Sequence, residues 1–288
     1  MKIIFTTALA LIAFAANSII NRLALGEGHI DAASFTAVRL LSGAITLTLL
    51  NTAIQRSTNN KTPFTKKATG SWKAGTALFI YALTFSYSYL HLDTGVGALI
   101  LFGTVQITMI LASFIAGKKL RLLEWIGIST AFLGFIYLIF PQLSTPSFTG
   151  LVLMTIAGIS WAGYTLMGRE STHPLQDTAY NFLRALPLVV VLLAVTFQTA
   201  HIRSQGIWLA ILSGSLASGL GYAIWYHALK SLTATRAAVV QLLVPIFAAA
   251  GGFIFIQEAI TSRLLLSSLF ILGGILLVVM GKEKNSTT

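Results

Sequence analysis

A chain of 288 residues with 56% hydrophobic and only 9% charged residues has too little polar surface to face water on all sides. Soluble domains carry roughly 25% charged residues, so lipid is the expected solvent for most of this chain. The absence of cysteine excludes disulfides and thiolate metal sites. The net charge of +11 comes from basic residues between apolar runs and not from a patch suited to nucleic acid.

The chain contains ten apolar runs of about the length that a helix needs to cross a bilayer, ~20 residues. They lack the alternation of apolar and polar residues that is typical of a membrane barrel. We therefore expect an all-α membrane protein with ten transmembrane helices. The first run is interpreted as a span and not as a cleaved signal peptide. The predicted spans are 3–25, 31–54, 72–90, 94–116, 122–140, 148–168, 178–198, 206–229, 234–256 and 263–281.

The basic residues predict how these spans are oriented. Most of the 19 Lys and Arg residues fall in segments that share one side of the membrane when the spans alternate. The opposite segments hold only Arg22, Arg203 and Arg263. Cytoplasmic loops are enriched in Lys and Arg, so we expect both termini and the loop 55–71 in the cytoplasm, with the protein in the cell inner membrane.

The two halves of the chain resemble each other. A repeat with an odd number of spans inserts its second copy upside down, and inverted repeats are typical of secondary transporters with a site near the midplane. The alternative is that apolar helices align by chance. The aligned pairs, at offsets that differ by a few positions, are Leu92 with Leu232, Gly134 with Gly274, Phe35 with Tyr180, Arg39 with Arg184 and Arg22 with Arg169.

The second half also carries a pattern known from a transporter family. Its parts are Gly-Leu-Gly-Tyr-Ala-Ile-Trp-Tyr-His-Ala-Leu over 219–229, Leu-Val-Pro-Ile-Phe over 243–247, Gln-Glu-Ala-Ile-Thr over 257–261 and the pair Gly273-Gly274. This resembles the EamA-type branch of the drug/metabolite transporter superfamily. The resemblance implies two five-span repeats, here 1–140 and 148–281, followed by a cytoplasmic tail, 282–288. It also implies transport of amino acids, other metabolites or drugs.

Two arginines, Arg39 and Arg184, lie inside predicted spans. An unpaired charge at such depth costs several kcal/mol, so each must face protein, water or a bound partner. One interpretation is that they flank a central cavity, one on each side, and attract a carboxylate. The other is structural, with each guanidinium bonded to helix-end carbonyls or reaching the membrane interface.

Aromatic and amide side chains at helical spacing are candidates for the lining of such a cavity. The alternative is that they form interfacial belts and contacts between helices. Pro245, near the middle of the span 234–256, is predicted to be a kink or a gating joint. The predicted substrate-binding residues are Asn17, Arg39, Tyr81, Gln106, Trp161, Tyr164, Arg184, Tyr222, Trp225 and Gln241.

The function classes can be separated by what the spans lack. No acidic residue falls at the middle of a span, which argues against an antiporter that exchanges protons for cationic drugs. No protease, phosphate-loop or hydrolase motif is present, so we expect no catalytic residue, metal or cofactor. The sequence predicts a secondary transporter for a small amphipathic metabolite, such as an amino acid, with alternating access around a central cavity and export as the favoured direction. A metabolite channel and a substrate-sensing protein on the same fold stay as alternatives. The expected partners are a small-molecule substrate and the lipid bilayer, not nucleic acid, and the oligomeric state stays open, a monomer included.

Overall fold

The computed structural model describes residues 2–57, 70–117, 120–139, 147–168, 171, 173–229, 232, 237 and 240–283. Over these residues the chain is helical except for connections and one isolated bridge between Ile30 and Ile202. The elements are α1 (Lys2–Gly26), α2 (Ala32–Ser57), α3 (Trp72–Ser88), α4 (Thr94–Ile115), α5 (Leu122–Ile139), α6 (Phe148–Gly168), α7 (Pro174–Thr196) with the 3-10 turn η1 (Phe197–Thr199), α8 (Ser204–Leu212), the π-helix η2 (Ser213–Leu220), α9 (Gly221–Leu229), α11 (Leu243–Gly251), the π-helix η3 (Gly252–Ile256) and α12 (Ser262–Glu283).

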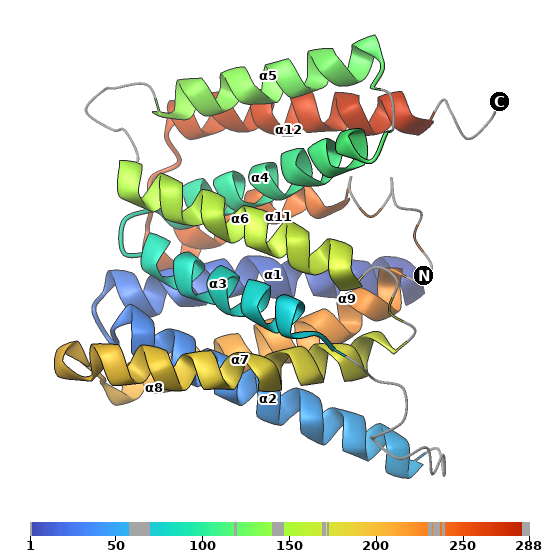
Figure 1. The fold of residues 1–288 in the computed structure, drawn as a ribbon. Helices are drawn as coiled ribbons and strands as arrows, with labels where there is room; N and C mark the ends of the chain where they lie inside the picture. The colour runs from blue at the N-terminus through green and yellow to red at the C-terminus, as the bar shows by residue number, and fades with distance from the viewer. Residues whose placement is uncertain are drawn as a thin grey trace.

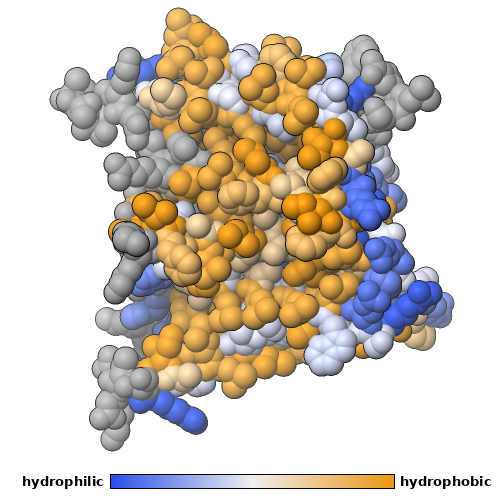
Figure 2. Space-filling model, turned by 180° about the vertical axis from the view of Figure 1, so that it is seen from behind, coloured by the Kyte–Doolittle hydropathy of each residue, from blue (hydrophilic) through white to orange (hydrophobic). Residues whose placement is uncertain are grey.

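These helices confirm an all-α, multi-pass membrane protein. Within the described part of the chain, seven helices are long and apolar enough to cross a membrane, and two shorter apolar helices cover 122–138 and 243–256. Helix α3, which corresponds to the predicted span 72–90, is 17 residues long. Each predicted span contains a helical segment over its described residues, although α7 begins at Pro174 and not at 178, and positions 140, 234–236, 238 and 239 lie outside the described residues. Figure 2 shows the broad apolar surface that such a protein presents to lipid, with hydrophilic residues gathered toward its edges.

The helices lie roughly side by side, with α1 in the middle of the bundle and the pair α5 and α12 along one edge (Figure 1). Helix α3 packs against α6, α2 packs against α7 and η2, and α1 packs against α9 and α11. One end of the bundle, called the Glu258 end, carries the last turn of α1 and the starts of α2, α4 and α12. The opposite end, called the Trp72 end, carries the starts of α3 and α7 (Figure 1).

Small residues allow the closest helix contacts. A Cβ on Gly127 of α5 would lie 2.5 Å from the carbonyl oxygen of Gly274 of α12, and the reverse distance is also 2.5 Å. Gly214 of η2 lies equally tightly against the backbone of Arg39 in α2. Without a hydrophobic driving force between helices in lipid, such close backbone contacts give van der Waals energy that larger side chains would prevent.

Candidate central site

Arg39 is buried in the middle of the bundle, with 1% of its surface exposed. Its Nε donates to Ser218 Oγ at 3.3 Å, and its Nη2 donates to Tyr81 Oη at 3.2 Å. Its guanidinium carbon lies 5.3 Å from the ring centroid of Tyr81 and 5.1 Å from that of Phe85. Its Nη1 has no hydrogen-bond partner among the described residues. The buried cation therefore keeps both N–H groups of Nη1 as unused donors.

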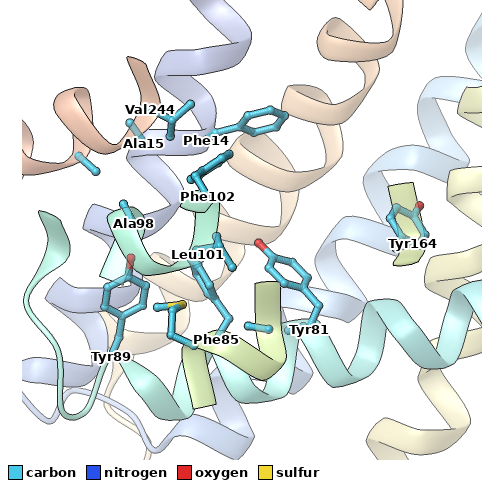
Figure 3. Packing of buried hydrophobic residues seen from close by; sticks show 14 of the residues in the cluster. Phe14, Ala15, Tyr81, Phe85, Tyr89, Ala98, Leu101, Phe102, Tyr164 and Val244 are labelled. Carbon is cyan, nitrogen blue, oxygen red and sulfur yellow. The ribbon is translucent and has the colours of Figure 1, made fainter. Parts of the chain in front are cut away.

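Aromatic rings from five helices surround this guanidinium or continue outward from it. The ring of Trp161 lies 4.8 Å from Tyr81, 4.9 Å from Tyr222 and 5.5 Å from Tyr164, centroid to centroid. Trp225 joins the group through Phe14, whose ring is 5.7 Å away. Figure 3 shows several of these buried side chains between their helices. The group, called the aromatic cluster below, consists of Phe14, Tyr81, Phe85, Trp161, Tyr164, Phe182, Tyr222 and Trp225.

A second polar group lies beside the aromatic cluster. Ser213 Oγ donates to Asn17 Oδ1 at 2.6 Å, and Asn21 Nδ2 donates to the backbone oxygen of Asn17 at 2.7 Å and to Ser213 Oγ at 3.3 Å. Ser86 Oγ, from α3, lies 3.5 Å from Asn21 Oδ1. All four side chains are buried, so these bonds meet the requirement that polar groups away from water find partners.

The π-helix η2 positions both polar groups. Ser213, at its start, bonds to α1, and Ser218, one π-turn later, bonds to Arg39. π-Helical segments are rare and occur often at functional sites. In this chain the wider turn lets one short segment donate or accept hydrogen bonds with both α1 and α2.

The structure brings together six of the predicted site residues in or against the aromatic cluster, and places a seventh, Asn17, next to it. No described contact joins the other predicted residues to this cluster. Gln106 is buried in α4, and Gln241 is half-buried before α11. Pro245 lies in the first turn of α11, just after a turn at Leu242, and its role as a kink or gating joint stays a prediction. The six are Arg39, Tyr81, Trp161, Tyr164, Tyr222 and Trp225.

Arg184 lies apart, toward the Trp72 end. Its guanidinium carbon is 5.6 Å from the ring centroid of Tyr180 on the same helix. A Cβ on Gly70 would lie 2.7 Å from its Nη1, so Arg184 packs against the chain just before α3. The Nη1 atoms of both arginines are buried without a hydrogen-bond partner among the described residues, but their surroundings differ: several rings and a serine for Arg39, one ring and the chain at Gly70 for Arg184.

Sequence reasoning did not select Asn21, Ser213 or Ser218. The spacing of Asn17 and Asn21 was a usable signal, because residues four apart share a helix face. The two serines had no such signal, since small hydroxyl residues are common in membrane helices as contacts between helices.

A pocket of 260 Å³ lies at the Glu258 end, between the start of α4 and the connection from η3 to α12. Beside it, Arg22 Nε lies 3.1 Å from Glu258 Oε1, Arg22 Nη2 lies 3.3 Å from Asp93 Oδ1, and Arg22 Nη1 donates to the backbone oxygen of Tyr89 at 3.0 Å. Burial raises the pKa of Glu258 above its ordinary value, while hydrogen bonds from Thr94 and the charge of Arg22 act in the opposite direction.

The fold and the buried central groups define a multi-pass helical membrane protein with a polar and aromatic interior. The model of the EamA-like transporter family matches residues 148–280. An uncharacterized protein of Pseudomonas aeruginosa is 44% identical over 278 residues, which cover 96% of this chain and 94% of the relative. The chain belongs to the EamA-like transporter family.

More distant relatives carry functional names. Two proteins named "probable amino-acid metabolite efflux pump" are each 24% identical. The one from Salmonella typhimurium matches over 72% of this chain and 77% of its own, and the one from Escherichia coli matches over 70% and 72%. A solved structure entitled "Crystal structure of protein" superposes with a TM-score of 0.64 at 15% identity and covers 95% of this chain and 96% of its own. That similarity shows a shared fold.

Proposed function

We propose that this member of the transporter family is a secondary transporter that exports a small amphipathic metabolite with a carboxylate, such as an amino acid, across the inner membrane by alternating access. The observation that carries the proposal is the buried guanidinium of Arg39, which keeps an unpartnered Nη1 beside the aromatic cluster. Export and the amino-acid class are supported by the names of the relatives from Salmonella typhimurium and Escherichia coli.

The chemistry of the site fits such a substrate. A guanidinium presents planar donors that match the two oxygens of a carboxylate. Ring faces accept an apolar group, and they also attract an ammonium by cation–π interaction. No acidic residue is among the described contacts of the aromatic cluster, so an amino group of the substrate would rely on the rings of Trp161 and its neighbours.

The proposed pair of inverted repeats, 1–140 and 148–281, is supported by two matching hydrogen bonds at opposite ends of the bundle. Each joins an aspartate to a backbone N–H of the other half and is called a clasp below. At the Glu258 end, Asp31 at the start of α2 accepts from the backbone N–H of His201, just before α8, at 2.9 Å. At the Trp72 end, Asp177 at the start of α7 accepts from the backbone N–H of Gly70, just before α3, at 3.2 Å. In each clasp the second span of one half holds the chain that enters the third span of the other half.

The same relation continues along the helices. Gly214, in the third span of the second half, packs against Arg39. Gly75, in the third span of the first half, packs against Arg184, with a Cβ-to-Cβ distance of 2.9 Å for an added Cβ. A pseudo-two-fold axis in the membrane plane would relate these pairs.

Of the expected tail 282–288, residues 282 and 283 continue α12, and 284–288 lie outside the described residues. Arg169 and positions 58–69 of the expected cytoplasmic loop also lie outside them.

Replacing Arg39 with Gln tests the substrate contact. Loss of a charged hydrogen bond should weaken binding by more than ~1.5 kcal/mol, about tenfold, with protein yield and thermal stability near wild type. The ligand would come from a thermal-shift screen of amino acids and other small carboxylates, and its affinity from tracer counterflow in proteoliposomes. Arg184→Gln is the matched control and should change affinity less, because Arg184 lies outside the aromatic cluster. If Arg39→Gln destroys stability while the surviving protein binds normally, Arg39 is structural and the site assignment fails.

The same vesicles separate the alternatives. A carrier gives saturable flux with counterflow, a channel gives unsaturated flux, and a sensing protein binds ligand without flux. Trp161→Ala and Tyr222→Phe test the aromatic lining. Loss of affinity on the first change alone would indicate packing of an apolar substrate group against the Trp161 ring, with the phenol hydroxyl dispensable.

A further inference from the structure

Arg22, near the end of α1, bonds to two separate segments at the Glu258 end, the α3–α4 connection and the η3–α12 connection. It reaches the backbone oxygen of Tyr89, the carboxylate of Asp93 and the carboxylate of Glu258. The side chain of Asp93 is 60% exposed, whereas that of Glu258 is 11% exposed. The contact with Glu258 is therefore the better protected of the two ion pairs from solvent screening.

Glu258 also accepts a hydrogen bond from the start of α4. Its Oε2 accepts from the backbone N–H of Thr94, the first residue of α4, at 2.8 Å. Asp93 precedes α4 but makes no capping bond with its side chain. The carboxylate of Glu258 thus takes the place of the N-cap acceptor and also stabilises the positive end of the helix dipole.

The backbone around Glu258 is shaped to bring its carboxylate inward. Among the described residues, Gln257 is the one non-glycine residue with a positive φ, 60°, a conformation that L-residues adopt at a cost. Gly252 leaves room on the other side, because a Cβ there would meet Glu258 Oε2 and would lie 3.0 Å from the Cβ of Thr94.

The boundary that Glu258 crosses is a tight seam between α11 with η3 on one side and α1 with α4 on the other. A Cβ on Gly251 would meet Ile19 of α1, and a Cβ on Gly95 of α4 would lie 2.8 Å from the Cβ of Ala249 in α11. The 260 Å³ pocket opens along this seam. Apolar contacts through glycines can separate without leaving polar groups unpaired. The polar bonds of Glu258 are therefore the specific interactions that hold the two sides of the seam together at the Glu258 end.

We propose that the bonds from Glu258 to Arg22 and Thr94 form the lock that closes the Glu258 end of the transport path, and that this lock must open once in each transport cycle. The inference rests on the proposed alternating access, to which it adds the closing device at one end. Arg22 and Asp93 are the charged groups that face Glu258 across the seam, and His91 and Arg263 line the same pocket.

Single cysteines introduced into this cysteine-free chain can measure the state of both ends. Ala249→Cys lines the pocket at the Glu258 end. Thr165→Cys lies one turn from Trp161 toward the Trp72 end, and its half-buried side chain serves as the reporter for that end of the bundle. Glu258→Gln removes the ion pair. We expect Glu258→Gln to raise the alkylation rate of Ala249→Cys about fivefold, which is the effect expected from the loss of one partly buried ion pair. The alkylation rate of Thr165→Cys should fall. Slowing at the second position follows because alternating access opens one end only when the other is closed.

Asp93→Asn is the matched control. It removes the same charge from the same arginine, but Asp93 lies on the Arg22 side of the seam, so neither rate should change. The charge exchange Arg22→Glu with Glu258→Arg should restore wild-type rates in part. Faster labelling at both reporters would mean general loosening and would overturn the lock. Unchanged rates in Glu258→Gln, or equal effects from Asp93→Asn, would overturn it too. The reporters need no substrate, so this test can fail while substrate binding at Arg39 stands, and the reverse.

Discussion

Gly214 has no side chain at the point where η2 crosses α2, and a methyl group there would overlap the backbone oxygen of Arg39. Overpacking of this kind costs typically 1–3 kcal/mol because neighbouring backbones must move apart. We expect Gly214→Ala to lower the free energy of unfolding by about that amount. The midpoint of thermal unfolding in detergent measures the effect.

Gly163 supplies the control for that substitution. It lies in α6 with nothing within 4 Å of an added Cβ. Gly163→Ala should therefore leave stability unchanged or raise it by up to about 1 kcal/mol through helix propensity. Equal midpoints for the Gly163 and Gly214 variants would contradict the close contact between η2 and α2.

At the scale of elements, α5 and α12 form a pair whose spacing depends on Gly127 and Gly274. A Cβ on Gly274 would lie 2.5 Å from the backbone oxygen of Gly127, so Gly274→Ala should separate the two helices locally. We expect faster hydrogen exchange in α5 and α12 with little change in α2 and α7, because local opening follows the contacts that are lost. Gly273→Ala, one residue away with open space around its Cβ, should leave the exchange rates at wild-type values. Uniform acceleration across the molecule would argue against a local contact.

The helices could be predicted well from the sequence, and their irregular parts could not. A span requires ~20 apolar residues, so apolar runs limit where the helices can lie. The first turn of α7, from Pro174, is polar and was missed by counting apolar residues, although proline at a helix start was a visible signal. The π-helices η2 and η3 have no such signal, because their wide turns are supported by contacts with residues far along the chain, such as Ser218 with Arg39.

Part of the candidate site could also be predicted from the sequence, and part could not. Periodicity selected Tyr81, Trp161 and Tyr222 because aromatic residues three or four apart share a helix face. It could not distinguish Arg39 from Arg184, which look alike in sequence and have different surroundings in the fold. The partners of Glu258 were also out of reach, because its contacts with Arg22 and Thr94 join loops and helix ends that are remote in sequence.

For the molecule as a whole, the distribution of basic residues predicts that the Trp72 end faces the cytoplasm. The start of α1 and the end of α12 lie on the same side of the bundle in Figure 1, as an even number of crossings requires. In intact cells, Gln198→Cys should react with a membrane-impermeant maleimide, and Asn60→Cys should react only after permeabilisation. The opposite labelling pattern would invert the proposed orientation.

The two clasps described above also limit which parts can move as units. Asp31 holds the chain before α8, Asp177 holds the chain before α3, and Arg39 of the first half has Ser218 of the second as a buried partner. At each end of the bundle, a helix of one proposed half thus holds the chain that leads into a helix of the other. A first half made alone would leave the guanidinium of Arg39 without Ser218 in hydrocarbon, at a cost of several kcal/mol. Nor can the halves swing past each other as intact bodies without tearing both clasps. Under the proposed alternating access, opening the seam that Glu258 spans would separate α11 and η3 from α1 and α4 and would leave both clasps unbroken, because the clasps join α2 to the chain before α8 and α7 to the chain before α3.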